Sequence, residues 1–124
     1  RDNKIILIYP IPEIGVNISR KLLNDYLKNK FKFKKNNIDN LNFNVPFEIY
    51  KMRSKSTFDL YNSLNNKNIY RIYPHKVLCD EHGTKNCFSF DNENIYYFDE
   101  HHLSVAGSKK INENIIRLID QLNK

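Results

Sequence analysis

The hydrophobic pattern of the chain begins with a short continuous run, KIILIY, over residues 4–9. A run of this length with no polar face is typical of a strand that is buried on both sides in a parallel sheet. Pro10 and Pro12 follow, and their rings exclude regular helix, so we expect residues 10–15 to form a loop at the carboxyl end of the strand. Ligands of open α/β sheets bind at this edge.

Apolar residues at helical spacing follow the loop. They predict a first helix with Asn17 or Ser19 as its N-cap. Its stripe comprises Ile18, Leu22, Leu23, Tyr26 and Leu27. Residues 28–44 are polar and rich in asparagine, which predicts a surface loop or irregular insert. A second helix is expected around residues 54–64, capped by Ser54 or Ser56.

The second half of the chain predicts short strands and a last helix. Residues 68–73, NIYRIY, alternate as a strand does and end at Pro74, and Val77 and Leu78 continue into the next loop. Two short strands are expected at residues 87–90 and 95–98, joined by a turn. Ser104 is the predicted cap of the final helix. Its buried stripe comprises Ile111, Ile115, Leu118, Ile119 and Leu122.

This order of elements predicts an α/β fold with sheet strands separated by helices, in a single domain over residues 1–124. Two convincing sheet strands are fewer than a doubly wound domain needs, which indicates a fragment or an unusually small sheet. The chain has no initiator Met and no signal peptide, and none of its apolar runs approaches the ~20 residues that span a bilayer. We therefore expect Arg1 to be a cut inside a longer protein.

Charge and cysteines narrow the functional classes. The formal net charge is +6, but the lysines are scattered and no zinc finger, RNP box or GxxG loop accompanies them, so we expect no nucleic-acid partner. Cys79 and Cys87 flank a turn-rich segment and form a disulfide in an oxidising compartment. In the cytosol they would be thiols or, with His82, metal ligands. The spacing is not that of a zinc knuckle and a fourth ligand is not obvious, which favours the disulfide.

The segment most informative about chemistry is residues 96–107, YYFDEHHLSVAG, between a short strand and the last helix. Asp99 and His102 are three residues apart, a spacing that brings both side chains to one side of a helical turn. A carboxylate beside an imidazole is the arrangement of a general base and the group that orients it. We expect His101 to be an exposed neighbour. A small metal site formed by these groups is disfavoured, because adjacent histidines seldom bind one ion together.

The pattern Asp99-x-x-His102-Leu103-Ser104-x-x-Gly107 resembles the last catalytic block of SGNH hydrolases. The HLS ending is similar to that of SGNH domains fused to membrane acyltransferases of the acyltransferase-three family, which O-acetylate surface glycans such as lipopolysaccharide. The loop PIPEIG and the cysteine pair ahead of the block strengthen the resemblance.

This resemblance implies the C-terminal part of a flavodoxin-like three-layer SGNH fold whose N-terminal strands are missing. It implies that Asp99 and His102 complete a catalytic triad, and that Pro12, Glu13 and Tyr97 lie near the substrate. The implied partners are a glycan acceptor and an N-terminal membrane acyltransferase domain of the same polypeptide. The implied location is the periplasmic side of the bacterial inner membrane. No metal or bound cofactor is required, and acetyl-CoA would be the acyl donor used by the membrane domain.

The chain departs from the family pattern in one important respect. The family's serine lies in a Gly-Asp-Ser block, but none of Gly15, Gly83 and Gly107 is followed by Asp-Ser. We expect the serine and its oxyanion hole upstream of this chain, and we expect an exposed sheet edge that could pair two copies. The alternative function is a non-catalytic carbohydrate-binding or interaction module that keeps the fold but not the chemistry.

Overall fold

The computed structural model describes residues 3–28 and 43–124, and a parallel strand pair lies at its centre. Strand β1 (Ile5–Ile8) pairs with β3 (Ile69–Ile72), and Ile5 lies opposite Ile69. Both strands are where the hydrophobic pattern predicts them, but the expected burial of β1 on both sides is wrong. Ile5 is 51% exposed and Ile8 44% exposed, because the parallel sheet within the described residues has two strands and both are edges. Parallel strands need a long crossover, which here contains helices α1 and α2. Most of the predicted polar insert over residues 28–44 lies outside the described residues.

Helix α1 (Ile18–Lys28) confirms the first predicted helix. The side-chain oxygen of Asn17 accepts a hydrogen bond from the backbone N–H of Arg20 at 2.9 Å, so Asn17 is the cap and not Ser19. Ile18 is buried in the core, but Leu23 and Leu27 are more than half exposed. The predicted stripe is therefore only partly buried.

Helix α2 (Phe47–Ser63) begins well before the predicted start. Pro46 precedes it, where the fixed φ and missing N–H of proline cost a helix nothing. The early start buries Phe47 and Tyr50, whereas Ser54 lies in the middle of the helix and is also buried. The predicted capping by Ser54 or Ser56 is wrong for this reason.

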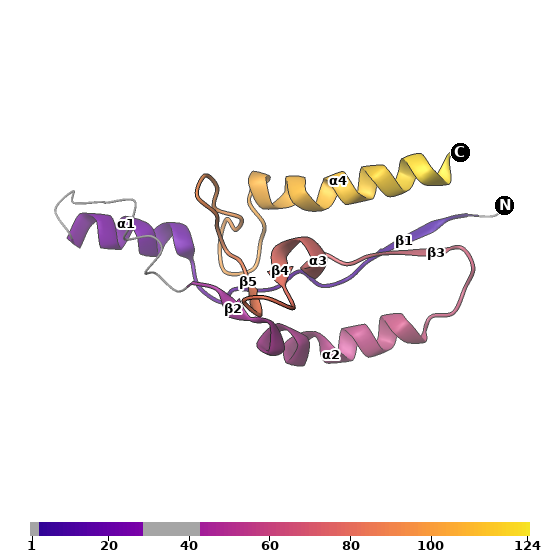
Figure 1. Ribbon diagram of the computed structural model, residues 1–124, viewed down its shortest axis with the longest axis horizontal. Helices are drawn as coiled ribbons and strands as arrows, with labels where there is room; N and C mark the ends of the chain where they lie inside the picture. Colours follow the sequence, from indigo (N-terminus) through magenta and orange to yellow (C-terminus); the bar gives the residue numbers. More distant parts are fainter. Residues whose placement is uncertain (1–2, 29–42) are drawn as a thin grey trace.

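Within the described residues, two helices and the parallel strand pair between them form an incomplete three-layer arrangement. Helices α2 and α4 (Val105–Leu122) lie on opposite sides of the parallel pair (Figure 1). On one side, the ring of Tyr9 packs edge-on against Phe58 of α2, with ring centroids 4.7 Å apart. On the other, the Lys4 ammonium donates to the carbonyl of Leu122 at the end of α4. This agrees with the expected α/β arrangement, although the parallel sheet within the described residues has two strands.

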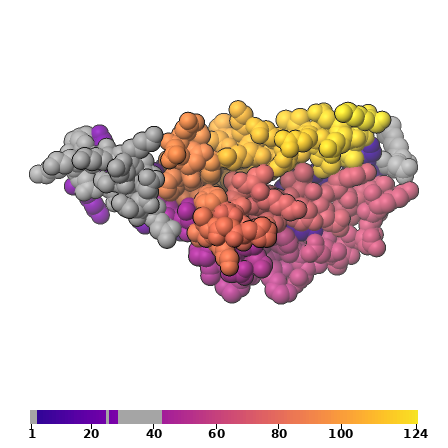
Figure 2. All heavy atoms as spheres, in the orientation of Figure 1, coloured from indigo at the N-terminus to yellow at the C-terminus, as the bar shows by residue number. Residues whose placement is uncertain are grey.

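The apolar stripe of α4 is buried in part. Figure 2 shows α4 alongside the residues of β3 on this face of the molecule. Ile111 is buried, and Ile115 and Leu118 pack against the core. Ile119 is exposed, contrary to the prediction. No helix among residues 3–28 and 43–124 is long and apolar enough to cross a membrane.

A second, antiparallel sheet lies beyond the parallel pair, in the order β2-β5-β4. Its strands are β2 (Val45–Pro46), β4 (Cys79–Asp80) and β5 (Asn86–Cys87). Helix α3 (His75–Leu78) precedes β4, where the sequence predicts only that Val77 and Leu78 continue into the next loop. The strands expected at 87–90 and 95–98 are reduced to β5 and two isolated bridges, Phe90 with Ile95 and Tyr97 with Leu103. A pairing of two copies through the sheet edge stays a prediction.

Candidate active site

Asp99 and His102 lie in contact on the loop between Tyr97 and helix α4. Nδ1 of His102 is 2.8 Å from Oδ2 of Asp99. The other carboxylate oxygen, Oδ1, accepts the backbone N–H groups of His101 at 2.8 Å and of His102 at 2.7 Å. The three-residue spacing thus brings the two side chains together, as the sequence predicts.

These hydrogen bonds determine the charge and the tautomer of the pair. They hold the pKa of Asp99 at about 2, mainly through the backbone N–H of His101 and then through the His102 side chain. At neutral pH the carboxylate is ionised and can only accept, so Nδ1 of His102 must be the donor. The lone pair of a neutral ring is then on Nε2, which is the tautomer that a general base needs.

The two histidines of the loop differ in their partners. The His102 side chain is 77% exposed, so its ring is accessible to a second reactant. The ring of His101 is directed to another segment, with Nδ1 3.6 Å from Oε2 of Glu13. Glu13 therefore lies beside the loop that carries the pair, near the position expected for it.

Two of the residues expected near the substrate, Pro12 and Tyr97, are buried. Tyr97 is 1% exposed, and its hydroxyl donates to the backbone carbonyl of Pro12 at 2.5 Å. Pro12 is itself fully buried. Both side chains are therefore buried among the described residues, and their place near a substrate stays a prediction. Together they join the 10–15 loop to the residues just before Asp99.

The loop is held at both ends by backbone contacts. The N–H of Phe98 donates to the carbonyl of His102 at 2.8 Å, which closes the loop on itself. The N–H of Gly15 donates to the carbonyl of Glu100 at 3.2 Å, from a left-handed conformation with φ of 67°. Glycine adopts this conformation without steric cost. The PIPEIG segment therefore positions the Asp99–His102 loop directly.

Ser104 anchors the end of the loop to helix α4. Its Oγ accepts the N–H of Gly107 at 3.2 Å, which confirms Ser104 as the N-cap. The same hydroxyl donates to the carbonyl of Ile95 at 2.6 Å. Both hydrogen-bonding functions of the hydroxyl are occupied, so Ser104 has a structural role and is not an available nucleophile. Ser89, the other serine close to this block, is fully buried.

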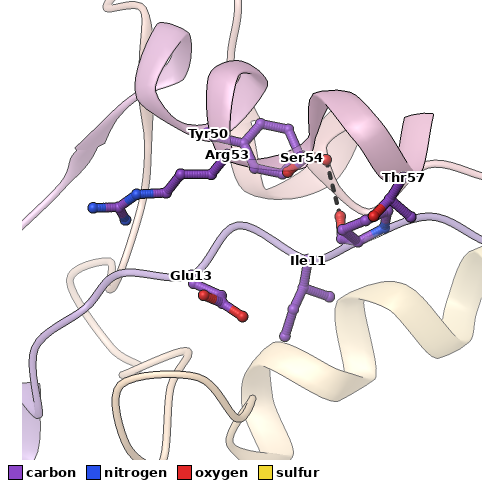
Figure 3. Close-up of a pocket in the computed structure, with 7 residues that line it drawn as sticks. Ile11, Glu13, Tyr50, Arg53, Ser54 and Thr57 are labelled. Atoms are coloured by element: carbon purple, nitrogen blue, oxygen red, sulfur yellow. Dashed lines mark hydrogen bonds between the residues drawn. The ribbon is translucent and has the colours of Figure 1, made fainter. Parts of the chain in front are cut away.

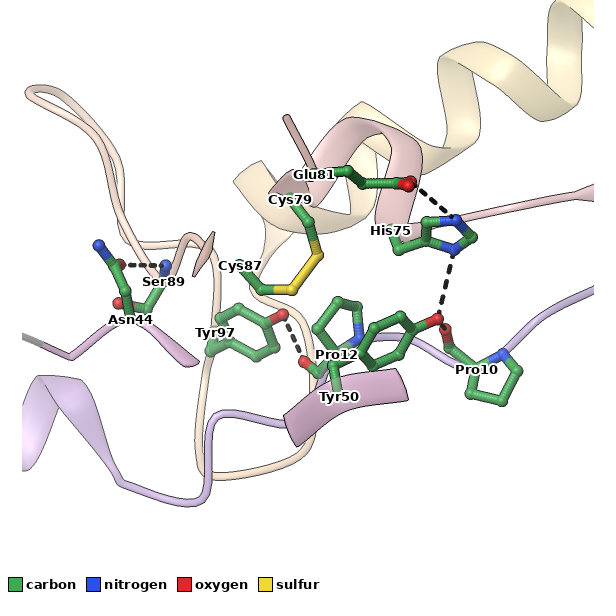
Figure 4. The surroundings of a disulfide bond; sticks show 10 residues. All are labelled: Pro10, Pro12, Asn44, Tyr50, His75, Cys79, Glu81, Cys87, Ser89 and Tyr97. Carbon is green, nitrogen blue, oxygen red and sulfur yellow. Dashed lines mark hydrogen bonds and ion pairs between the residues drawn. A yellow bond between two sulfur atoms is a disulfide. The ribbon is translucent and has the colours of Figure 1, made fainter. Parts of the chain in front are cut away.

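A chain of side chains links the disulfide hairpin to the start of the 10–15 loop (Figure 4). Cys79 and Cys87 form the predicted disulfide between β4 and β5. In the same hairpin, Glu81 is 3.2 Å from Nε2 of His75, and Nδ1 of His75 is 3.3 Å from the Tyr50 hydroxyl. That hydroxyl donates to the carbonyl of Pro10 at 2.9 Å. Burial lowers the pKa of His75, and burial raises that of Tyr50, so the phenol is neutral at neutral pH.

Helix α2 and the 10–15 loop enclose a small polar pocket of about 160 Å³ (Figure 3). Arg53, Ser54 and Thr57 line it from the helix, and Glu13 and Ile11 line it from the loop. The helical pattern does not indicate that these residues line a pocket, because it does not show which loop the helix will face. No group of three or more potential metal ligands occurs in the described part of the chain.

One comparison with known proteins is decisive for the family. The model of the SGNH domain fused to AT3 domains matches residues 1–117. The chain belongs to this family. Neither the curated proteins nor the solved structures include a significant match to the chain. Membership supports an SGNH module associated with an acyltransferase domain on the same polypeptide, and hence a membrane-protein context.

Proposed function

We propose that this SGNH domain supplies the general base of a serine-dependent O-acyl transfer or ester hydrolysis on cell-surface glycans, lipopolysaccharide among them. The contact between Asp99 and His102 carries the proposal. Nε2 of His102 would take the proton of the attacking hydroxyl and return it to the leaving group. Asp99 would hold the tautomer and stabilise the imidazolium.

The nucleophile in this proposal is a serine outside residues 1–124. The sequence has no Gly-Asp-Ser block, and the hydroxyls of Ser104 and Ser89 are respectively engaged and buried. The exposed ring of His102 leaves room for a hydroxyl from another segment to approach. The domain itself would need no metal or bound cofactor, and acetyl-CoA would serve the membrane domain as acyl donor.

The proposed location is the periplasmic side of the bacterial inner membrane. Fusion of the family to AT3 domains supports the membrane context. The Cys79–Cys87 disulfide supports an oxidising compartment, since disulfides seldom persist in the cytosol. The fusion thus supports the membrane context, and the disulfide supports the oxidising side of that membrane.

The test compares two adjacent histidines in the intact protein. His102→Ala should remove nearly all acyl transfer, because loss of a triad base costs on the order of a millionfold in the best-studied serine hydrolases. His101→Ala should reduce it only mildly, since its ring faces Glu13 and not Asp99. Transfer is measured with radiolabelled acetyl donor and purified glycan. Equal losses in both variants would contradict the assignment.

A non-catalytic carbohydrate-binding module is the alternative, and the absence of a Gly-Asp-Ser block favours it. It predicts that His102→Ala leaves both glycan binding and acetylation unchanged. The same pair of variants therefore distinguishes the two functions.

A further inference from the structure

The polar pocket between α2 and the 10–15 loop has opposite charges on its two walls. Arg53 lies on the helix side and Glu13 on the loop side (Figure 3). No ion pair joins them, and among residues 3–28 and 43–124 the Arg53 guanidinium has no carboxylate partner within 4.0 Å. An arginine left unpaired beside a pocket has all its donors available to a ligand.

The remaining lining combines hydroxyl groups with apolar surface. Thr57 and the largely buried Ser54 add hydroxyls on the helix side. Pro10 and Ile11 provide apolar surface on the loop side. A sugar ring has this same division between hydroxyl edges and C–H faces. Its hydroxyls can donate to a carboxylate and accept from a guanidinium, and both bonds are of the stronger, charge-assisted kind.

The pocket adjoins the loop that carries the proposed base. Glu13 lines the pocket and is also 3.6 Å from the ring of His101, the residue before His102. On the same loop, the N–H of Gly15 donates to the carbonyl of Glu100. A ligand between Glu13 and Arg53 is therefore next to the reactive segment and not on a distant face.

From this arrangement we propose that the pocket is the acceptor subsite, that it binds one neutral sugar residue of the glycan, and that Arg53 and Glu13 determine its specificity. Glu13 accepts from one hydroxyl of the ring and Arg53 donates to another. The two charges cancel, so the pocket has no net attraction for an acidic sugar, and a uronate carboxylate would face that of Glu13. This inference rests on the proposed function, because it takes the bound ring to be the acyl acceptor.

The experiment measures binding separately from catalysis, in the intact protein. The probes are the neutral methyl glycosides of glucose, galactose and mannose and their matched uronates. Their binding is measured by saturation-transfer NMR at pH 7. We expect the neutral probes to bind about fivefold tighter than their uronates, the upper range for an exposed charge pair. Arg53→Gln should weaken the neutral probes by a similar factor. Glu13→Gln should abolish the discrimination against uronates.

The controls separate this inference from the proposed function. Arg20→Gln removes an exposed arginine on α1, away from the pocket, and should leave all binding unchanged. His102→Ala should abolish transfer but leave probe binding intact. If His102→Ala abolishes transfer while Arg53→Gln binds every probe as before, the subsite is wrong and the base assignment stands. The subsite assignment is also wrong if the uronates bind more tightly than the neutral probes. It is likewise wrong if no probe binds with a Kd of 50 mM or below (about 2 kcal/mol).

Discussion

Gly107 of helix α4 packs directly against the backbone carbonyl of Tyr96. A Cβ at this position would overlap the Tyr96 oxygen and touch the side chain of Leu103. The N–H of Ser104 donates to the same carbonyl at 2.9 Å. The first turn of α4 therefore lies directly against the segment that leads into the Asp99–His102 loop, and only a residue without a side chain allows this approach.

We predict that Gly107→Ala destabilises the protein. The methyl group meets backbone that cannot rotate away, and overpacking of this kind costs about 1–3 kcal/mol. The higher helix propensity of alanine offsets up to about 1 kcal/mol of this cost. Urea unfolding measures the change, with Ser108→Ala in the same helix turn as the control that should change stability little. An unchanged midpoint in Gly107→Ala would show that the contact is not close.

The second prediction concerns the pH dependence contributed by Asp99. Its folded pKa of about 2 lies below the unfolded value of ~3.9. A depressed folded pKa adds stability that is present above the unfolded pKa and is lost as pH falls towards the folded pKa. The stability difference between wild type and Asp99→Asn should therefore be full above about pH 5 and should shrink between about pH 4 and pH 2.

An NMR titration of the Asp99 carboxyl carbon checks the cause directly. The backbone N–H of His101 is the largest contributor, so His102→Ala should leave the Asp99 pKa below its usual range. A normal pKa in wild type would mean that the loop does not hold these hydrogen bonds in solution. A normal pKa in His102→Ala alone would assign the shift to the imidazole.

The third prediction is that the disulfide stabilises the hairpin before the catalytic block. Cys79 and Cys87 are separated by eight positions, and closing so short a loop contributes about 2–3 kcal/mol. The double variant Cys79→Ala/Cys87→Ala should lose about this much in urea unfolding. Reductant should lower the stability of wild type and leave the double variant unchanged. Alkylation of both cysteines in unreduced protein, seen by mass spectrometry, would rule out the bond.

The fourth prediction tests the contact between the 10–15 loop and the catalytic loop. Gly15 has φ of 67°, so Gly15→Ala should cost roughly 1–2 kcal/mol in backbone strain. Gly15→Asn should cost less, since asparagine tolerates this conformation better. Acyl transfer by the intact protein should fall in the order glycine, asparagine, alanine, because the N–H to Glu100 is displaced progressively. Equal transfer by all three would show that the contact does not position the base.

The sequence predicts the elements that depend on local patterns. The positions of the two strands, the Ser104 cap and the Asp99–His102 contact depend on neighbouring residues, so local pattern and spacing are sufficient to predict them. The burial of Tyr97 and the position of Arg53 beside the pocket depend on contacts between segments that are far apart in the sequence, which spacing does not reveal. The hydroxyl of the buried Tyr97 donates to the carbonyl of Pro12, which is 85 positions away in the sequence. The start of α2 was missed because Phe47 and Tyr50 are buried by tertiary contacts that helical periodicity does not reveal.

The last prediction is that the chain of residues 1–124, expressed alone, does not hydrolyse acetyl esters. Among the described residues, the two serines nearest in sequence to His102 on its N- and C-terminal sides do not offer a free hydroxyl, since Ser104 donates to Ile95 and accepts from Gly107, and Ser89 is buried. In well-studied triads, loss of the serine removes roughly a millionfold in rate. Hydrolysis of an acetyl ester by the purified chain is the measurement, with Asp99→Ala as the control. Turnover that disappears in Asp99→Ala would mean that a serine within the chain is the nucleophile, and that the Asp99–His102 pair belongs to a complete site.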